Sequence, residues 1–179
     1  FHIALQSGCD ATLAAMGRRY TTDIYRETLG LIRGLVPDAA ITTDLIVGFP
    51  GESDRDFDDS CRFIEACGLA AVHVFPYSPR PGTAASGMCP QVPPKDKRQR
   101  VAKALSLART VARKFRESAV GSVHDVLWEA ETAPGSGIYS GFTSNYLRVF
   151  IRSGKNIANQ VLRARITRYH GDKLWTELV

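Results

Sequence analysis

Ala39–Glu52, which reads AAITTDLIVGFPGE, is the stretch that decides the fold expected for this chain. Its first part is filled with β-branched and apolar residues, a pattern that predicts a strand buried on both faces, as in a parallel sheet. The pattern breaks at Gly48, and the following Phe49, Pro50 and Gly51 predict a turn. A plain core strand followed by a turn and the rim of a ligand site both fit these residues.

Strand alternation divides this stretch between two sides. One side carries Ile41, Thr43, Leu45 and Val47, and the other carries Thr42, Asp44, Ile46 and Gly48. The second side is the candidate for chemistry, because a carboxylate in a buried strand needs a partner and a terminal glycine lets a ligand approach the backbone. In α/β folds the carboxyl end of a strand is where sites form.

Another short strand is expected at the start of the chain, where His2–Ser7 is apolar and then turns polar. Gln6 and Ser7, at its carboxyl end, are candidates to face a ligand. The connection that follows contains Arg18 and Arg19, which fit a clamp for a carboxylate or phosphate. Ordinary surface charge explains these two arginines equally well.

Two helices are expected between the strands of this half. The first begins at Thr21 and ends before Pro37, with its apolar stripe at Ile24, Thr28, Leu31, Ile32 and Leu35. The second begins at Ser53 with a variant of the capping box and has Gly68 at its C-cap.

A third strand is expected over Ala71–Tyr77, with His73, Phe75 and Tyr77 on one side. His73 stands alone and is expected to be a buried histidine whose hydrogen bonds are satisfied. The order strand, helix, strand, helix, strand predicts half of an α/β barrel or part of a doubly wound sheet. Because the chain begins at Phe1, inside an expected strand, we expect a fragment whose missing part lies N-terminal.

The composition, with 44% hydrophobic and 23% charged residues, is ordinary for a globular protein and allows one domain or two small ones in 179 residues. No signal peptide or membrane-spanning run is visible, which favours a cytoplasmic protein without a membrane partner. The cysteines lack the close spacing of a metal motif, so reduced thiols and no metal ligands are expected from Cys9, Cys61, Cys67 and Cys89.

Charge is distributed unevenly along the chain. Residues 1–90 carry a net charge of −4, residues 91–117 carry +7, and residues 118–179 carry +2. The basic part follows a Pro- and Gly-rich loop, Ser78–Pro94, and its periodicity predicts one long helix over Lys95–Ser118. Such a segment indicates a nucleic acid or another polyanionic partner, although a solvated helix face has the same pattern.

The last sixty residues have a sequence pattern typical of short strands. Strands are expected over Val123–Glu131, Tyr146–Arg152, Gln160–Tyr169 and Lys173–Leu178, with turns at Ala133–Gly141 and Ser153–Asn156. This spacing predicts a small closed β-barrel of the OB type, a fold that commonly binds single-stranded nucleic acid through aromatic rings and arginines. The candidate RNA-binding residues are Tyr146, Arg148, Arg163 and Arg165.

Four stretches, taken together, resemble the radical S-adenosylmethionine (SAM) methylthiotransferases over nearly the whole chain. They are LQSG at Leu5–Gly8, MGRRY at Met16–Tyr20, TTDLIVGFPGE at Thr42–Glu52 and VHVFPYSPRPGT at Val72–Thr83. The wording of the last is most similar to the branch that acts on N6-threonylcarbamoyladenosine, next to the tRNA anticodon. Sister branches act on isopentenyladenosine or on an aspartate of a ribosomal protein. The C-terminal sixty residues, with TSNYLRV at Thr143–Val149, resemble the TRAM domain, a small RNA-binding barrel.

The resemblance implies a fold and a domain order. Residues 1–89 would form the C-terminal half of a radical SAM partial (β/α) barrel, residues 90–118 a basic connecting helix, and residues 119–179 a TRAM-like β-barrel. SAM would lie across the carboxyl ends of the strands of the partial barrel.

The resemblance also implies cofactor-binding residues. They are Gln6, Ser7, Arg18, Asp44, Ile46, Gly48, Phe75 and Tyr77. Arg18 would pair with the methionine carboxylate of SAM, and Phe75 and Tyr77 would frame its adenine. Asp44, Ile46 and Gly48 occupy the place of the G-x-I-x-G motif of many radical SAM enzymes, with Asp44 replacing the first glycine.

The motif C-x-x-x-C-x-x-C, which ligates the radical-generating cluster in this family, is absent from the sequence. The intact enzyme would therefore hold two 4Fe-4S clusters with residues outside this chain, and the 179 residues alone would be inactive. The implied reaction, fed by an electron donor, abstracts hydrogen from C2 of an adenine near the tRNA anticodon and inserts a methylthio group. The alternatives are the two sister substrates and a non-catalytic RNA-binding module.

Overall fold

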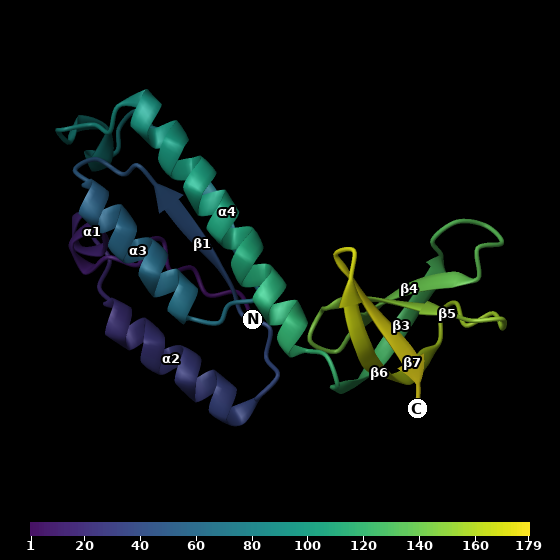
Figure 1. The fold of residues 1–179 in the computed structure, drawn as a ribbon. Coiled ribbons are helices and arrows are strands. Elements are labelled where there is room, and N and C mark those ends of the chain that lie inside the picture. The colour runs from purple at the N-terminus through teal and green to yellow at the C-terminus, as the bar shows by residue number, and fades with distance from the viewer. The chain divides into compact units, whose positions relative to one another are not determined.

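The computed structural model describes residues 1–179 and forms two compact units, Phe1–Ala112 and Arg113–Val179 (Figure 1). The long helix α4, Pro94–Ser118, runs through the division between them. The expected division into residues 1–89, 90–118 and 119–179 stays a prediction. None of the helices combines the length and apolarity that crossing a membrane requires.

The sheet of the first unit pairs β1, Thr42–Val47, with β2, Ala71–Pro76, in parallel. In this register Asp44 lies opposite His73, and Ile46 lies opposite Phe75. The two carboxyl ends therefore meet at one edge of the sheet, as the expected order of strands and helices requires.

The expected strand His2–Ser7 is only partly formed. It makes two isolated parallel bridges to β1, His2 to Thr42 and Gln6 to Leu45, so the segment has one residue more than β1 between the bridges. The Thr43 hydroxyl fills the resulting gap, because it accepts the Leu5 N–H at 2.9 Å and donates to the Ile3 carbonyl at 2.7 Å. The extra residue works like a β-bulge and interrupts the ladder without leaving these backbone groups unpaired.

Burial on β1 alternates strictly. Thr43, Leu45 and Val47 are buried in the core, whereas Thr42, Asp44 and Ile46 are only half-buried. The expectation of a strand buried on both faces is therefore wrong for this structure, because its described elements cover only one side of the sheet. The side that carries Asp44 is left partly open.

Three helices precede the loop after β2: α1, Asp10–Ala15, α2, Thr22–Leu35, and α3, Asp54–Ala66. The sequence predicted no helix at α1. The capping box of α3 is confirmed, because the Ser53 hydroxyl accepts the Asp56 N–H at 3.2 Å while the Asp56 carboxylate accepts the Ser53 N–H at 2.9 Å. A short 3-10 turn, Ala84–Gly87, lies within the expected loop before α4.

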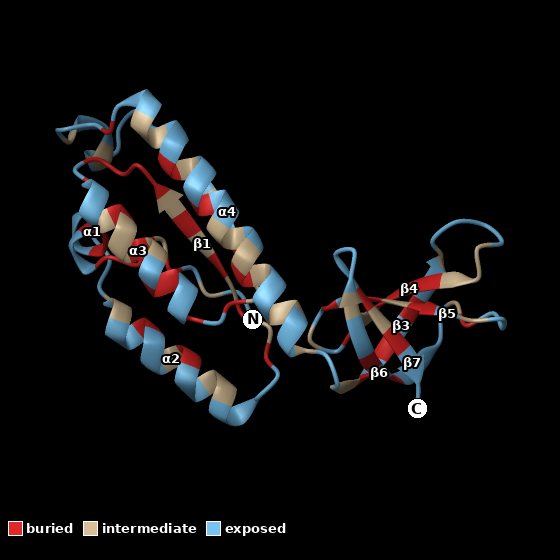
Figure 2. Cartoon of the chain, viewed as in Figure 1, coloured by how far each residue is buried: buried red, intermediate tan, exposed pale blue.

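The apolar stripe predicted for α2 is wrong at three of its five positions, while Ile32 packs against the core as predicted. Ile24, Leu31 and Leu35 are 50, 66 and 76% exposed, whereas Tyr25 and Leu29 face the core. Figure 2 shows this helix with a narrow buried strip. Both sets repeat at three and four residues, so periodicity alone did not separate them.

The second unit is a closed five-stranded barrel with the strand order β3-β4-β5-β7-β6. Its strands are β3, Val123–Glu131, β4, Ile138–Thr143, β5, Arg148–Arg152, β6, Val161–His170, and β7, Lys173–Leu178. The closed barrel that the strand spacing predicted is thus present. Trp128, Val149 and Ile166 fill its interior and are buried.

Strand β4 is not among the strands expected from the sequence, because IYSG at its start is typical of a turn. Glycine and serine are uncommon in strands, but the barrel needs a small residue here. A Cβ on Gly141 would lie 2.6 Å from the Leu127 carbonyl oxygen and 3.0 Å from the Trp128 ring. Close approach of β3 and β4 is therefore possible only at a glycine.

We predict that Gly141→Ala destabilises the barrel by about 2 kcal/mol, because the added methyl group overlaps backbone as well as core atoms. Thermal or urea unfolding of the chain measures this change. Gly154→Ala is the matched control, since a Cβ there meets nothing within 4 Å. Equal stability of the two variants would contradict the tight β3–β4 contact.

Candidate functional site

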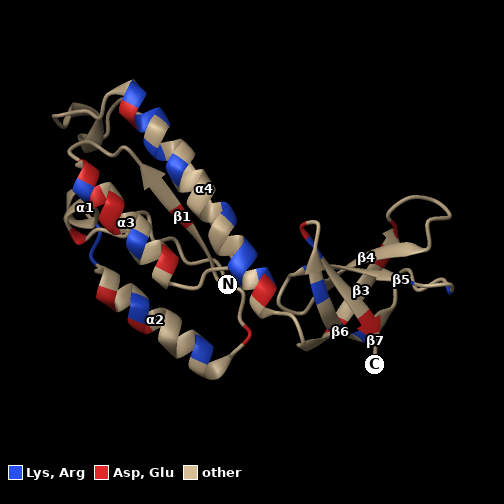
Figure 3. Ribbon diagram, in the orientation of Figure 1, with Lys and Arg blue, Asp and Glu red and all other residues tan.

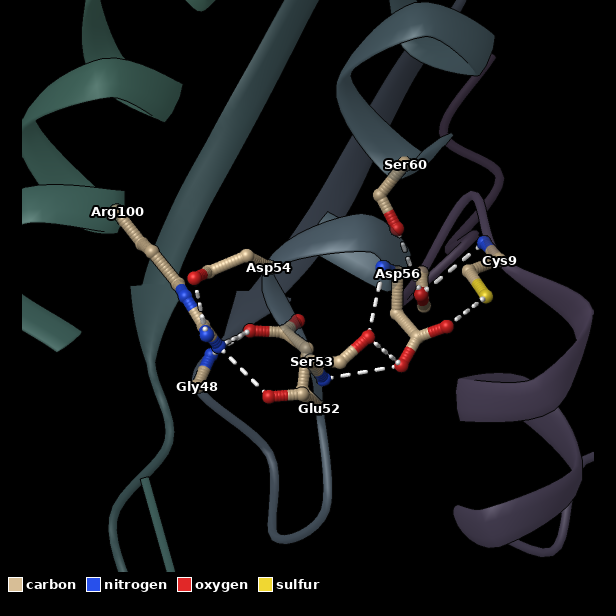
Figure 4. A network of polar contacts seen from close by, with 9 residues as sticks. Cys9, Gly48, Glu52, Ser53, Asp54, Asp56, Ser60 and Arg100 are labelled. Atoms are coloured by element: carbon tan, nitrogen blue, oxygen red, sulfur yellow. Dashed lines mark hydrogen bonds and ion pairs between the residues drawn. The ribbon is translucent and has the colours of Figure 1, made fainter. Parts of the chain in front are cut away.

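The turn that follows β1 is held by a buried ion pair (Figure 4). Glu52 is 6% exposed, and its Oε2 accepts the Gly48 N–H at 2.9 Å and Nη1 of Arg100 at 2.8 Å. Arg100, from α4, also donates to the Glu52 carbonyl at 2.9 Å and to the Asp54 carboxylate at 2.8 Å. One guanidinium thus joins the turn, the start of α3 and α4.

Burial raises the pKa of the Glu52 carboxyl above its ordinary value. The Gly48 N–H and the Arg100 guanidinium oppose that rise, since both stabilise the carboxylate. For Arg100, burial lowers the pKa, but the hydrogen bonds to Asp54 and Glu52 outweigh burial and leave the pKa raised. The pair is therefore held by mutual hydrogen bonding in a place where neither charge alone is favourable.

Gly48 has a conformation that favours glycine, with φ at +76°. The space that a side chain would occupy is taken by Lys97 of α4, because a Cβ on Gly48 would lie 2.8 Å from its Cγ. The sequence predicted a glycine here so that a ligand could approach the backbone. In the structure the group that approaches the Cβ side of Gly48 is the stem of Lys97.

The half-buried side of the sheet carries polar groups that contact one another. Asp44 lies 3.3 Å from Nε2 of His2, and the other ring nitrogen of His2 lies 2.9 Å from the Thr42 hydroxyl. The rings of His2 and His73 are 5.9 Å apart. His73 was expected to be buried, but it is exposed, because this side of the sheet is uncovered.

Aromatic residues lie at the carboxyl end of β2. Phe75 is half-exposed on the open side of the sheet. Tyr77 continues the pairing, donating its N–H to the Val47 carbonyl at 2.8 Å, and its ring meets Phe49 edge-on at 5.3 Å. The Tyr77 hydroxyl oxygen is buried without a hydrogen-bond partner, so a polar group is available here for a ligand.

The remaining predicted cofactor residues differ in placement. Gln6 adopts φ +71° beside β1, and its carbonyl accepts the Ile46 N–H at 2.9 Å. Ser7 is fully buried, and its hydroxyl lies 3.0 Å from the Ser60 hydroxyl and accepts the Cys9 N–H, so it faces the core and not the open side. Arg18 lies in the exposed segment after α1.

The structure therefore brings most of the predicted site together at one edge of the sheet. The residues on or beside the neighbouring strand ends are Gln6, Asp44, Ile46, Gly48, Phe75 and Tyr77. The Ser7 hydroxyl does not face this edge, because it contacts the Ser60 hydroxyl of α3. Lys97 and Arg100 were missed, because a basic residue in a basic helix has the same sequence signal whether it faces solvent or the core. The cofactor roles of the eight residues named in the sequence analysis stay predictions.

No group of three or more histidine, cysteine, aspartate or glutamate side chains in residues 1–179 is arranged to hold a metal ion. All four cysteines are free thiols. Burial raises the pKa of both Cys61 and Cys67 to about 11. Cys9 is also buried, and its thiol lies 3.4 Å from the Asp56 carboxylate.

We predict that only Cys89 is alkylated quickly by iodoacetamide in the folded chain, because it is the exposed cysteine. At about pH 8 a thiol of pKa near 11 is ionised to roughly one part in a thousand, and burial also blocks access. Mass spectrometry of the time course counts the labels, and the protein unfolded in urea provides the control with four. Rapid labelling of Cys61 or Cys67 would contradict the packing of α3.

A row of aromatic and basic side chains crosses the outside of the barrel. Phe150 on β5 lies opposite Trp175 on β7, and their rings are 6.1 Å apart. Arg168 of β6 lies over the Trp175 ring at 5.7 Å, and Lys173 lies over the Phe150 ring at 4.9 Å. Phe150 and Trp175 were missed in the sequence analysis. The signal that could have found this face is the alternation in β5, which puts Arg148, Phe150 and Arg152 on one side.

The row extends to the predicted Tyr146 and Arg148. Tyr146 is 82% exposed, and its ring lies 5.2 Å from that of Phe142, which Arg148 covers at 5.5 Å. Arg148 also lies 3.6 Å from the Glu129 carboxylate. We call Phe142, Tyr146, Arg148, Phe150, Arg168, Lys173 and Trp175 the aromatic row.

Arg163 and Arg165, the other predicted RNA-binding residues, lie elsewhere on β6. Both are exposed and alternate with the buried Ala164. In the strand register Arg163 faces Asp125 of β3, and Arg165 faces Glu177 of β7. The structure therefore places Tyr146 and Arg148 in the aromatic row, and Arg163 and Arg165 outside it.

Comparison with known proteins agrees with this fold. The family model of the radical SAM superfamily matches residues 1–64. Coproporphyrinogen III oxidase from Escherichia coli, described as a radical SAM enzyme, superposes with a TM-score of 0.54 at 13% identity, over 79% of this chain and 40% of its own. The likeness to that enzyme shows the fold alone.

Relatives of higher identity match both units. A tRNA-2-methylthio-N(6)-dimethylallyladenosine synthase from Symbiobacterium thermophilum is 35% identical over 100% of this chain and 38% of its own length. A threonylcarbamoyladenosine tRNA methylthiotransferase from Thermotoga maritima is 39% identical over 82% of this chain and 33% of its own. The chain thus spans about a third to two fifths of the length of these relatives.

The radical SAM part of this likeness lies in residues 1–64. Over its whole length, the chain belongs to the radical SAM methylthiotransferase family.

Proposed function

We propose that this chain is part of an enzyme that adds a methylthio group to C2 of N6-threonylcarbamoyladenosine next to the tRNA anticodon. Relatives named for threonylcarbamoyladenosine and for dimethylallyladenosine both match at 30–39% identity. The VHVFPYSPR wording of β2 and the loop after it favours the first substrate. Dimethylallyladenosine, which is the isopentenyladenosine named in the sequence analysis, is the alternative substrate.

The observation that carries the proposal is the juxtaposition at the open edge of the sheet. Asp44, Ile46 and Phe75 face the uncovered side, and Gly48 and Tyr77 follow at the strand ends. An aromatic ring, backbone groups and an unpartnered buried hydroxyl are what an adenosyl group requires: stacking and a few fixed hydrogen bonds. These residues fit the adenosyl part of SAM.

SAM, when bound beside a reduced 4Fe-4S cluster, supplies the 5′-deoxyadenosyl radical in this family. Both 4Fe-4S clusters, and contact with the electron donor, would belong to residues outside this range, because residues 1–179 hold no cluster of metal-ligating side chains. The described residues contribute binding and orientation. Phe75 and Tyr77 would hold the adenine, and Arg18 would reach the carboxylate of the methionine part.

The second unit would hold the tRNA as a TRAM domain. Its aromatic row combines exposed rings with cations above them, which is the arrangement that binds unpaired bases and backbone phosphates. A whole enzyme with these parts would act on tRNA in the cytoplasm. A non-catalytic RNA-binding module is the second candidate, because the aromatic row by itself suffices for binding.

The reaction is tested with the full-length protein carrying reconstituted clusters, SAM, a reductant and tRNA with or without threonylcarbamoyladenosine. Mass analysis of the nucleosides should show a methylthio gain on threonylcarbamoyladenosine alone. A gain on dimethylallyladenosine alone would select the alternative substrate. RNA binding with neither SAM cleavage nor any gain would support the non-catalytic module.

We predict that Arg148→Gln with Arg168→Gln weakens tRNA binding about tenfold and lowers the salt slope by about two, because each arginine neutralises one phosphate. Arg163→Gln with Arg165→Gln is the charge-matched control. It should weaken binding less, since Arg148 and Arg168 lie over rings of the aromatic row and the two control arginines lie outside that row. Filter binding at several salt concentrations measures both, and an equal loss would reject the aromatic row as the contact surface.

A further inference from the structure

Two cations of α4 reach over the two strand ends of the proposed cofactor site. We propose that Lys97 and Arg100 are positioning residues, which fix the carboxyl ends of β1 and β2 in the arrangement that SAM requires. The inference rests on the proposed function, because it gives these residues their purpose. Lysines and arginines recur along α4 (Figure 3). Lys97 and Arg100 differ from the exposed ones because they donate to the backbone carbonyls of Tyr77 and Glu52.

Arg100 acts on the end of β1. It is 9% exposed and donates to three oxygens, the carbonyl and carboxylate of Glu52 and the carboxylate of Asp54. Glu52 in turn accepts the Gly48 N–H, so the chain of bonds runs from α4 to the last predicted cofactor residue of β1. Only the planar fork of an arginine can reach these partners together.

The energetic balance of this cluster favours positioning over stability. Desolvation offsets much of the energy of a buried ion pair, and Nε of Arg100 is buried without any partner. An apolar side chain would fill the same space at lower cost. What it would not supply is a set of directed bonds that fixes the turn from Gly48 to Glu52.

Lys97 acts on the end of β2. Its ammonium donates to the Tyr77 carbonyl at 3.0 Å and lies 5.3 Å from the centre of the Tyr77 ring. Its aliphatic stem fills the space beside Gly48. The Lys97 side chain thus contacts the ends of both strands. It also holds the Tyr77 ring in place beside the proposed adenine position.

The next cation on the same side of α4 provides a control. Lys103 follows Arg100 by three residues and pairs with Asp58 of α3 at 2.7 Å, at an exposed position. It joins α3 to α4 as Arg100 does, but it contacts no strand end. A loss seen with Lys97 and Arg100 but not with Lys103 therefore separates positioning from helix packing.

The variants are Lys97→Met, Arg100→Gln and, as control, Lys103→Met, made in the full-length protein with its clusters. SAM affinity is measured by equilibrium dialysis, and protection of the Gly48 amide by hydrogen exchange. Each of the first two variants should weaken SAM binding about tenfold, the effect expected when a charge-assisted hydrogen bond is lost. Arg100→Gln should also speed exchange at Gly48, while Lys103→Met leaves both unchanged.

Asp54→Asn covers the case in which Arg100→Gln does not fold, since the Asp54 side chain is 94% exposed and its loss only loosens the fork. Asp54→Asn should weaken SAM binding about two- to threefold. Arg100→Lys, which keeps the charge, should lose less SAM affinity than Arg100→Gln. The inference is overturned if SAM affinity is unchanged both in Lys97→Met and in whichever Arg100 or Asp54 variant folds. An equal loss of affinity in Lys103→Met would also overturn it. If the unaltered protein binds no SAM, the proposed function fails first.

Discussion

The buried contact between Arg100 and Glu52 is the interaction that sets the geometry at the end of β1. It is made by residues 48 positions apart, and it ties α4 to the turn that ends β1. Two parallel strands do not by themselves fix the turns at their carboxyl ends, because the chain leaves each strand freely. Here the turn after β1 is fixed from outside by a charge, and the direction in which α3 begins is fixed with it through Asp54.

The fold was predictable where a local pattern has one reading. The capping box at Ser53, the proline that ends α2 and the strands β3 and β7 all follow from short-range chemistry. The errors occur where one sequence pattern fits two different structures. In α2 the exposed set, with Ile24, repeats like the buried set, with Tyr25, and the Tyr25 hydroxyl bond to the Ile3 carbonyl decides between them only in three dimensions. Strand β4 was missed because Gly141 is required by a contact 14 residues away.

The β1 residues of the candidate site were predictable from strand alternation. The α4 residues that contact them were not. Asp44, Ile46 and Gly48 follow from the period of two along β1, and their register with β2 follows from parallel pairing. Lys97 and Arg100 lie about 50 residues later in a helix with many other cations. Their inward direction depends on Glu52 and Tyr77, which the sequence does not connect to them. Ser7 shows the converse, since it precedes Gly8 in a matching motif and yet its hydroxyl is held by Ser60.

On the barrel, the same residue type serves two different electrostatic settings. Arg168 lies over the ring of Trp175, so its charge stays available to a phosphate while its plane extends an aromatic surface. Arg165, three positions earlier, faces Glu177, and a phosphate near it would meet the carboxylate as well. The β-bulge between Ile166 and Arg168 allows both arginines to face outward although an odd number of positions separates them. Without that bulge Arg168 would point into the barrel, and the aromatic row would end at Trp175.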